Sequence, residues 1–153
     1  MSGFTNRGRY SILSYVFRGA TMPTNLYVAL VTSAVAPTVD TNTFSELTEI
    51  AAGNGYTAGG IALTRNSTDF DALTEDDSGN LAYVQVRDLV WTASGGNLPA
   101  SGSGARYAIL TDDNATQGSR LVLAWWDLSS DRSVSSGQPL TLQNCELRLT
   151  TPA

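Results

Sequence analysis

The fold is decided by three apolar segments, Leu81-Ala-Tyr-Val-Gln-Val-Arg-Asp-Leu-Val-Trp-Thr92, Ala105-Arg-Tyr-Ala-Ile-Leu-Thr111 and Arg120-Leu-Val-Leu-Ala-Trp-Trp-Asp127. In the first segment apolar side chains recur at a period of two, at Ala82, Val84, Val86 and Val90. This alternation is typical of a half-buried β-strand. Residues 94–104 and 112–119 are rich in Gly, Ser, Asp and Asn, and they join the segments. Short strands separated by such turns predict an antiparallel sheet.

Three further strands are expected outside this unit. Residues 25–32 are apolar almost throughout, which predicts a central strand covered on both faces. Residues 56–63 form another, and the pair Gly59-Gly60 marks a bulge or a close backbone approach. In residues 139–150 the alternation changes phase, and a bulge near Asn144 restores it. We therefore predict an all-β, antiparallel β-sandwich with a short N-terminal helix, and both jelly-roll and immunoglobulin-like strand orders fit.

Two helical segments are predicted. We expect residues 1–5 to fray, and a helix over residues 6–19 to end at Gly19. Its apolar residues fall at helical spacing, at Tyr10, Leu13, Val16 and Phe17. This face must be buried on the chain's own sheet or on a neighbour.

Thr43 and Glu46 form a capping-box pattern that predicts a helical turn over residues 44–50. The 153 residues make a single domain, with 1–20 as its N-terminal segment.

Composition narrows the classes of function. The chain has a net charge of −5, and its nine cationic residues are all arginine. This balance argues against a nucleic-acid-binding module. Arg7, Arg9 and Arg18 make only a small basic group, whose simplest interpretation is solvated or ion-paired helix residues. Neither a secretory signal nor an apolar run of membrane-spanning length is present, so we expect a soluble chain made in a cytoplasm, without a membrane partner.

The residues that carry chemistry are few. Without histidine, Ser–His and Cys–His mechanisms and most zinc sites are excluded. Asp112 and Asp113 are explained better by turn chemistry than as a catalytic pair. Cys145, the one cysteine, is expected to be a buried thiol. We predict no catalytic residue, no cofactor and no metal. The best metal candidate is the acidic stretch 69–77, where a calcium site and a solvated loop both remain open.

Trp91, Trp125 and Trp126 admit two interpretations. They could form a sugar-stacking platform, but core positions in strands are the stronger interpretation. Of the adjacent pair, one ring is expected to face the core while the other covers an edge or an interface. We take Trp126 as the interface residue.

Several segments carry a resemblance to a family of small tailed-phage virion proteins. They are Asn25-Leu-Tyr-Val-Ala-Leu-Val-Thr-Ser33, Gly53-Asn-Gly-Tyr-Thr-Ala-Gly-Gly60, Val90-Trp-Thr-Ala-Ser-Gly-Gly96 and Gly104-Ala-Arg-Tyr-Ala-Ile-Leu-Thr-Asp112, together with the Trp-Asp ending at Asp127. The likeness spans residues 26–149. Similar small β-sandwich proteins serve as capsid cement or decoration subunits, and others are labelled tail-fibre-like. The resemblance thus implies a non-enzymatic structural part of a phage particle, without choosing between head and tail.

From these observations we expect a capsid decoration (cement) protein. It would bind the outer surface of the major capsid protein shell as a homo-oligomer such as a trimer, and would reside on the virion after synthesis in the host cytoplasm. Arg7, Arg9 and Tyr10 are the expected inter-subunit residues, and Trp126 an interface residue. The alternatives are a tail or head-fibre component and a glycan-binding module for host attachment. A hydrolase is the third hypothesis.

Overall fold

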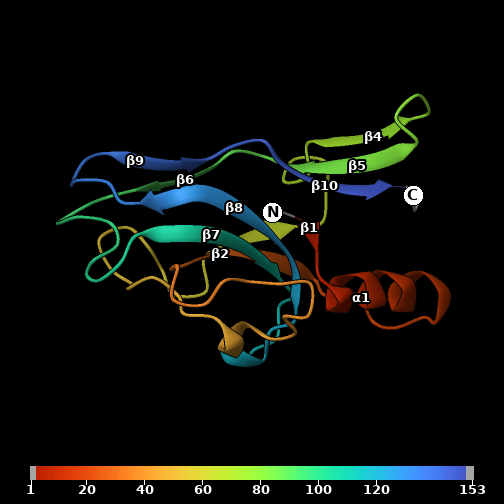
Figure 1. Ribbon diagram of the computed structural model, residues 1–153, viewed down its shortest axis with the longest axis horizontal. Helices are drawn as coiled ribbons and strands as arrows, with labels where there is room; N and C mark the ends of the chain where they lie inside the picture. Colours follow the sequence, from red (N-terminus) through yellow and green to blue (C-terminus); the bar gives the residue numbers. More distant parts are fainter. Residues whose placement is uncertain (1–2, 151–153) are drawn as a thin grey trace.

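A computed structural model describes residues 3–150 of the chain. Its β-strands are antiparallel and form two layers, with one helix at one end (Figure 1). The strands, in chain order, are β1 (Gly3–Phe4), β2 (Asn25–Val31), β3 (Ile61–Thr64), β4 (Ala72–Asp76), β5 (Leu81–Val86), β6 (Leu89–Thr92), β7 (Ala105–Thr111), β8 (Val122–Arg132), β9 (Pro139–Leu142) and β10 (Cys145–Thr150). The helical elements are α1 (Asn6–Phe17) and the 3-10 turns η1 (Phe44–Glu46) and η2 (Gln117–Ser119). The predicted all-β sandwich with a short N-terminal helix is confirmed.

One layer is a five-stranded sheet in the order β1-β8-β7-β2-β3. The other layer contains the three-stranded sheet β10-β5-β4 and the two-stranded sheet β6-β9. The β5-β10 pairing ends at Val86↔Cys145, and the β6-β9 pairing begins at Leu89↔Leu142. On each of the two chain segments only two residues lie between these pairs. The two small sheets are therefore successive parts of one ribbon. Across the interruption the Gln143 amide donates to an Asp88 carboxylate oxygen at 2.9 Å.

The main core fills the space between the layers. From the five-stranded sheet come Val28, Leu30, Leu63, Leu110 and Trp126, and from the ribbon come Val86, Leu89, Trp91, Leu140 and Leu147. A second cluster lies on the other face of the large sheet, made of Ala29, Val31, Phe44, Ile109, Val122 and Trp125. Because β2 contributes to both clusters, the prediction of a central strand covered on both faces is confirmed.

Several sequence-based boundaries need correction. The predicted strand 81–92 is two strands, and the phase changes between them, so that Leu89 and Trp91 are buried while Val90 is exposed. Residues 81–92 also do not join β7 and β8 in one sheet. The acidic stretch contains β4, which was not predicted, because its only large apolar residue is Leu73. The strand expected over 120–127 runs from Val122 to Arg132.

The remaining differences are local. The predicted strand 56–63 is reduced to β3, because residues 53–60 turn back on themselves. A Cβ on Gly60 would overlap the Val28 backbone, so the glycine pair does mark a close approach. The capping box is present, with the Thr43 amide donating to Glu46 Oε1 at 2.8 Å, but the turn ends at Glu46. Gly3–Phe4 pair with β8 rather than fraying, and the rest of that prediction, on residues 1–2, lies outside the described residues. The chain does break at Asn144, whose φ is 55°.

Candidate functional site: the outward face of the N-terminal helix

Helix α1 is anchored at its first turn by Thr5. The Thr5 hydroxyl accepts a hydrogen bond from the Gly8 amide at 2.8 Å and donates one to the Val122 carbonyl at 2.6 Å. The Thr5 amide also donates to the carbonyl of Leu123 at 3.0 Å. An N-cap of this kind satisfies a helix amide that has no partner within the helix. Here the same side chain joins α1 to β8, so the helix starts at a fixed point on the sheet.

The inward face of α1 is built from small residues. Gly8 and Ser11 are its two buried residues. A Cβ on Gly8 would overlap the Leu123 carbonyl oxygen and lie 2.7 Å from its carbonyl carbon, so only glycine allows this contact between helix and sheet. Ile12 and Tyr15 continue the same face and are partly buried. The helix therefore packs through the face that lacks large apolar side chains.

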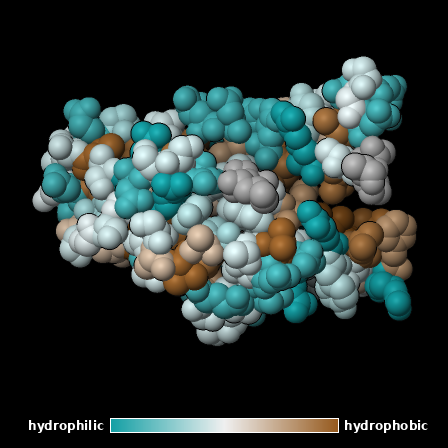
Figure 2. Space-filling view, viewed as in Figure 1, coloured by the Kyte–Doolittle hydropathy of each residue, from teal (hydrophilic) through white to brown (hydrophobic). Residues whose placement is uncertain are grey.

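The predicted apolar face points the other way. Tyr10, Leu13, Val16 and Phe17 are 63%, 56%, 61% and 73% exposed. Tyr10, Leu13 and Phe17 share the spacing of Gly8, Ser11 and Tyr15 but start two residues later, which turns them about 200° around the helix axis. Figure 2 shows hydrophobic side chains gathered at this end of the molecule, over α1. Of the two partners predicted for this face, the chain's own sheet is excluded.

Arginines border this outward face, which we define by Tyr10, Leu13, Val16 and Phe17. The Arg7 guanidinium lies 5.6 Å from the centre of the Tyr10 ring, and Arg7 Nε is buried without a hydrogen-bond partner. Arg9 and Arg18 are exposed. The Asp40 carboxylate accepts a hydrogen bond from the Asn6 side chain at the start of α1, at 2.9 Å. Within residues 3–150 no ion pair joins Arg7, Arg9 or Arg18 to a carboxylate. The surface is therefore apolar with a cationic rim.

A cavity of about 200 Å³ lies behind the helix. Its lining is apolar and includes Ile12 and Tyr15 of α1, Phe70, Val84 of β5 and Leu147 of β10. Side chains of α1 thus reach toward the β10-β5-β4 sheet without filling the space between them. The helix is held chiefly by β8.

The sequence-predicted interface residues divide into two groups. Arg9 and Tyr10 are exposed on α1, and Arg7 is partly exposed beside them, so the three lie together on one surface. Trp126 does not join them, and its assignment to an interface is wrong. It is buried in the main core, and its indole Nε1–H donates to the Glu146 carbonyl at 3.0 Å. Trp125 is buried on the opposite face of β8 because residues 36–39 and the second cluster cover that face.

The acidic stretch does not converge on one point. Asp69 pairs with Arg87 and accepts the Thr64 amide at 2.7 Å, and these hydrogen bonds hold the pKa of its carboxyl below the ordinary value. Asp76 closes the hairpin turn by accepting hydrogen bonds from the Gly79 amide and the Ser78 hydroxyl, and these bonds, the Gly79 amide most of all, lower the pKa of its carboxyl. Within residues 3–150 no group of three or more acidic or cysteine side chains is placed to hold a metal ion.

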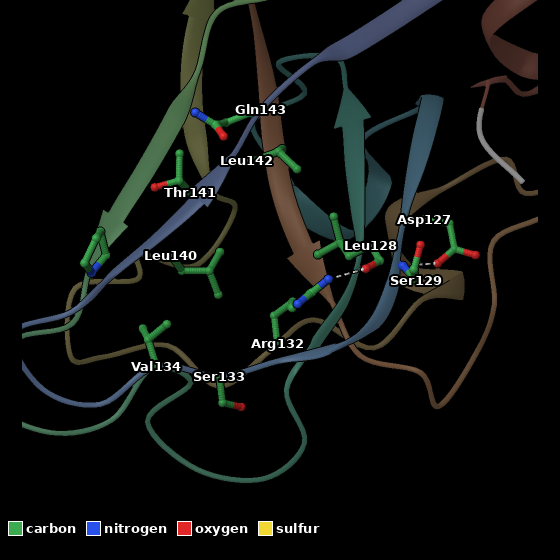
Figure 3. A pocket seen from close by; sticks show the side chains of 11 residues that line it. Asp127, Leu128, Ser129, Arg132, Ser133, Val134, Leu140, Thr141, Leu142 and Gln143 are labelled. Atoms are coloured by element: carbon green, nitrogen blue, oxygen red, sulfur yellow. Dashed lines mark hydrogen bonds between the residues drawn. The ribbon is translucent and has the colours of Figure 1, made fainter.

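A groove of about 470 Å³ runs between the end of β8 and β9 (Figure 3). Its carboxylate, Asp127, accepts the Ser129 amide at 2.8 Å and the Arg106 guanidinium at 3.1 Å. These contacts hold the pKa of Asp127 low, the Ser129 amide most of all. The Arg132 side chain turns to the Leu128 carbonyl, at 3.3 Å. Asp127, Arg132 and Gln143 of this groove are thus engaged by neighbouring groups of the chain, and the lining brings no second carboxylate to it.

Two buried titratable groups lie in the core. Burial raises the pKa of the Cys145 thiol to about 12. Burial, with the Glu49 carboxylate nearby, also raises the pKa of Tyr56. The Tyr56 hydroxyl accepts the Leu30 amide at 2.9 Å and donates to Glu49 Oε1 at 2.7 Å. Both groups are therefore neutral at pH 7, and Tyr56 ties β2 to the loop before β3.

Comparisons with protein-family models, curated proteins and solved structures gave no match for this chain. No helix within residues 3–150 is long and apolar enough to cross a membrane. The sequence predicted the residues of the outward face of α1 but not the direction in which they point. The spacing predicted its apolar residues correctly, whereas its orientation is indicated by the small residues Gly8 and Ser11, at i and i+3 on the buried side of the helix.

Proposed function

We propose that this chain is a non-enzymatic structural protein of a phage particle. In this proposal it is a capsid cement subunit that binds the outer surface of the major capsid protein shell and stabilises it. Copies of the chain contact one another through the N-terminal helix. The resemblance of residues 26–149 to small virion proteins supports the class of protein, and the geometry of α1 supports binding between surfaces.

The outward face of α1 is the observation that carries the proposal. Exposed apolar patches on soluble proteins mark interaction sites when they are contiguous and rimmed by polar residues. Here the patch lies on a helix that is fixed to β8 through Thr5 and Gly8, so it is presented in one orientation. A preorganised surface binds with less loss of conformational entropy than a flexible arm. These properties suit a subunit that clamps an assembly.

The alternative of a glycan-binding module loses its main support. Stacking on sugars requires an exposed aromatic platform, and Trp91, Trp125 and Trp126 are all buried. A tail or head-fibre component would use the outward face of α1 in the same way as a cement subunit. The two alternatives differ in where the protein binds on the particle.

The test is to mix the purified protein with undecorated phage shells and to examine them by cryo-electron microscopy. Two matched variants accompany the wild type. Phe17→Ser removes the most exposed side chain of the outward face, and Val90→Ser removes an exposed apolar side chain on β6. We expect regular density over the seams between hexamers or at local three-fold positions. Occupancy should fall for Phe17→Ser and stay unchanged for Val90→Ser.

Two results would overturn the cement proposal. Protein located only at the tail vertex, on otherwise bare shells, would identify a tail component. Shells and tails that both stay bare at saturating protein would exclude a virion-binding role of this kind. Equal loss of binding for Phe17→Ser and Val90→Ser would show that shell binding does not depend on contacts between copies through the outward face.

A further inference from the structure

The β4–β5 hairpin carries an apolar row that leaves the core. Leu147 of β10, Val84 of β5 and Leu73 of β4 are direct cross-strand partners, so their side chains share one face of the sheet. Leu147 is 3% exposed, Val84 is partly buried, and Leu73 is 82% exposed. Because β4 is the edge strand of its sheet, the row ends at an uncovered edge. Exposed edges of this kind are ready sites of association.

The exposed end of this row is acidic. Asp71 and Glu75 stand two residues before and after Leu73, so along an extended chain they share its face, and both are exposed. Asp77 adds a further exposed carboxylate at the turn. No arginine lies between Arg65 and Arg87. The edge of the hairpin thus exposes one apolar side chain, Leu73, with carboxylates on both sides of it.

The outward face of α1 has the opposite rim. Arg9 and Arg18 lie on either side of its apolar side chains, separated along the helix axis by about 13 Å at about 1.5 Å per residue. Asp71 and Glu75 are separated by about 13 Å along the strand at about 3.3 Å per residue. The two surfaces of the chain are therefore opposite in charge, and their charged pairs have similar separations along the helix axis and along the strand. Figure 1 places both at the same end of the molecule, on different layers.

We infer that the outward face of α1 binds the β4–β5 hairpin of a second copy of this chain. Leu73 packs against Leu13 and Phe17, and the carboxylates of the hairpin meet Arg9 and Arg18. Since helix and hairpin lie at one end of each copy, a closed symmetric assembly engages both surfaces of every copy. The inference deepens the self-association within the proposed function and rests on it for the presence of several copies.

The test measures self-association in solution, without shells, by sedimentation equilibrium at low and high salt. Three variants are compared with the wild type: Arg9→Glu with Arg18→Glu, Asp71→Arg with Glu75→Arg, and all four substitutions together. Like charges placed across an interface weaken it strongly, so each two-residue variant should raise the dissociation constant by about tenfold or more. The four-residue variant exchanges the charges and should restore association to about threefold of the wild-type value.

Asp131→Arg is the control for the hairpin variant, because it also replaces a carboxylate by a guanidinium at an exposed position away from the hairpin. It should leave association unchanged. Circular dichroism checks that every variant is folded. A wild type that stays monomeric at all concentrations overturns the inference. So does association that depends on the arginines but not on Asp71 and Glu75, which would place another surface against α1. An assembly that forms as described but leaves shells bare would refute cement while upholding this contact.

Discussion

The contact between Gly8 and β8 determines whether Gly8→Ala raises or lowers the free energy of unfolding. In an isolated helix, Gly→Ala stabilises by about 1 kcal/mol. In this structure the added methyl group overlaps the Leu123 carbonyl, and the obstacle is backbone, so the helix itself has to move. Overpacking costs typically about 1–3 kcal/mol, and loss of an N-cap such as Thr5 costs about 1 kcal/mol more. We expect Gly8→Ala to lower the free energy of unfolding by about 1–3 kcal/mol.

The assay is urea unfolding followed by the fluorescence of the three buried tryptophans, with Ser14→Ala as the control in the same helix. Ser14→Ala should be neutral or stabilising by up to about 0.5 kcal/mol, because it changes propensity away from the sheet. For a domain of this size, each kcal/mol lost from the free energy of unfolding should also reduce Tm by about 2–4 °C. A Gly8→Ala variant as stable as the wild type, or more stable, would refute the close contact between α1 and β8.

Three further predictions concern the interior and acid stability. Tyr56→Phe leaves the buried Leu30 amide without its acceptor and should cost about 1–3 kcal/mol in the same unfolding assay. Asp69 has a folded-state pKa below its ordinary 3.8, so its contribution is present above that pH and disappears as pH falls through the folded value. Asp69→Asn, measured from pH 6 to pH 2, should therefore show a weaker loss of stability in acid than the wild type. The Cys145 thiol, buried with a pKa of about 12, should resist Ellman's reagent at pH 8 in the native protein and react once urea unfolds the chain.

Much of the fold could be predicted because the local signals agreed with the tertiary structure. The strand 105–111 was found with its observed bounds, since a short apolar run between glycine-rich and acidic turns has one simple interpretation. The phase change near Asn144 was visible as a shift between Leu142 and Cys145. Its nature was not, because a bulge within a strand and a passage from one sheet to the next give the same pattern.

The errors at β4 and at Trp126 have a common physical cause. Alternation reports burial only where one face of a strand is covered and the other is solvated. β4 extends beyond the core, so its apolar residue Leu73 is exposed. Its sequence of polar residues therefore resembles that of a loop. β8 is covered on both faces, so Trp125 and Trp126 are both buried, although an isolated alternation rule places one of them outside. Coverage of this kind depends on residues distant in sequence.

The orientation of α1 was open for a different reason. A helical stripe of apolar residues predicts that the face is covered, but not by which molecule. The inward face is defined by Gly8, whose value lies in the absence of a side chain against Leu123. A hydrophobic pattern gives no weight to such a residue. The candidate site is therefore defined by the tertiary structure, in which the apolar stripe and the sheet lie on opposite sides of the helix.

We propose above all that the outward face of α1 serves association between molecules rather than the folding of its own chain. The decisive experiment compares Phe17→Ser with the wild type by sedimentation equilibrium and by urea unfolding. We expect the substitution to weaken self-association by about tenfold or more, while the unfolding free energy of the dissociated chain changes by less than about 0.5 kcal/mol, as for other exposed positions. Unchanged association, or an unfolding free energy lowered by about 2 kcal/mol or more as for a core residue, would contradict it.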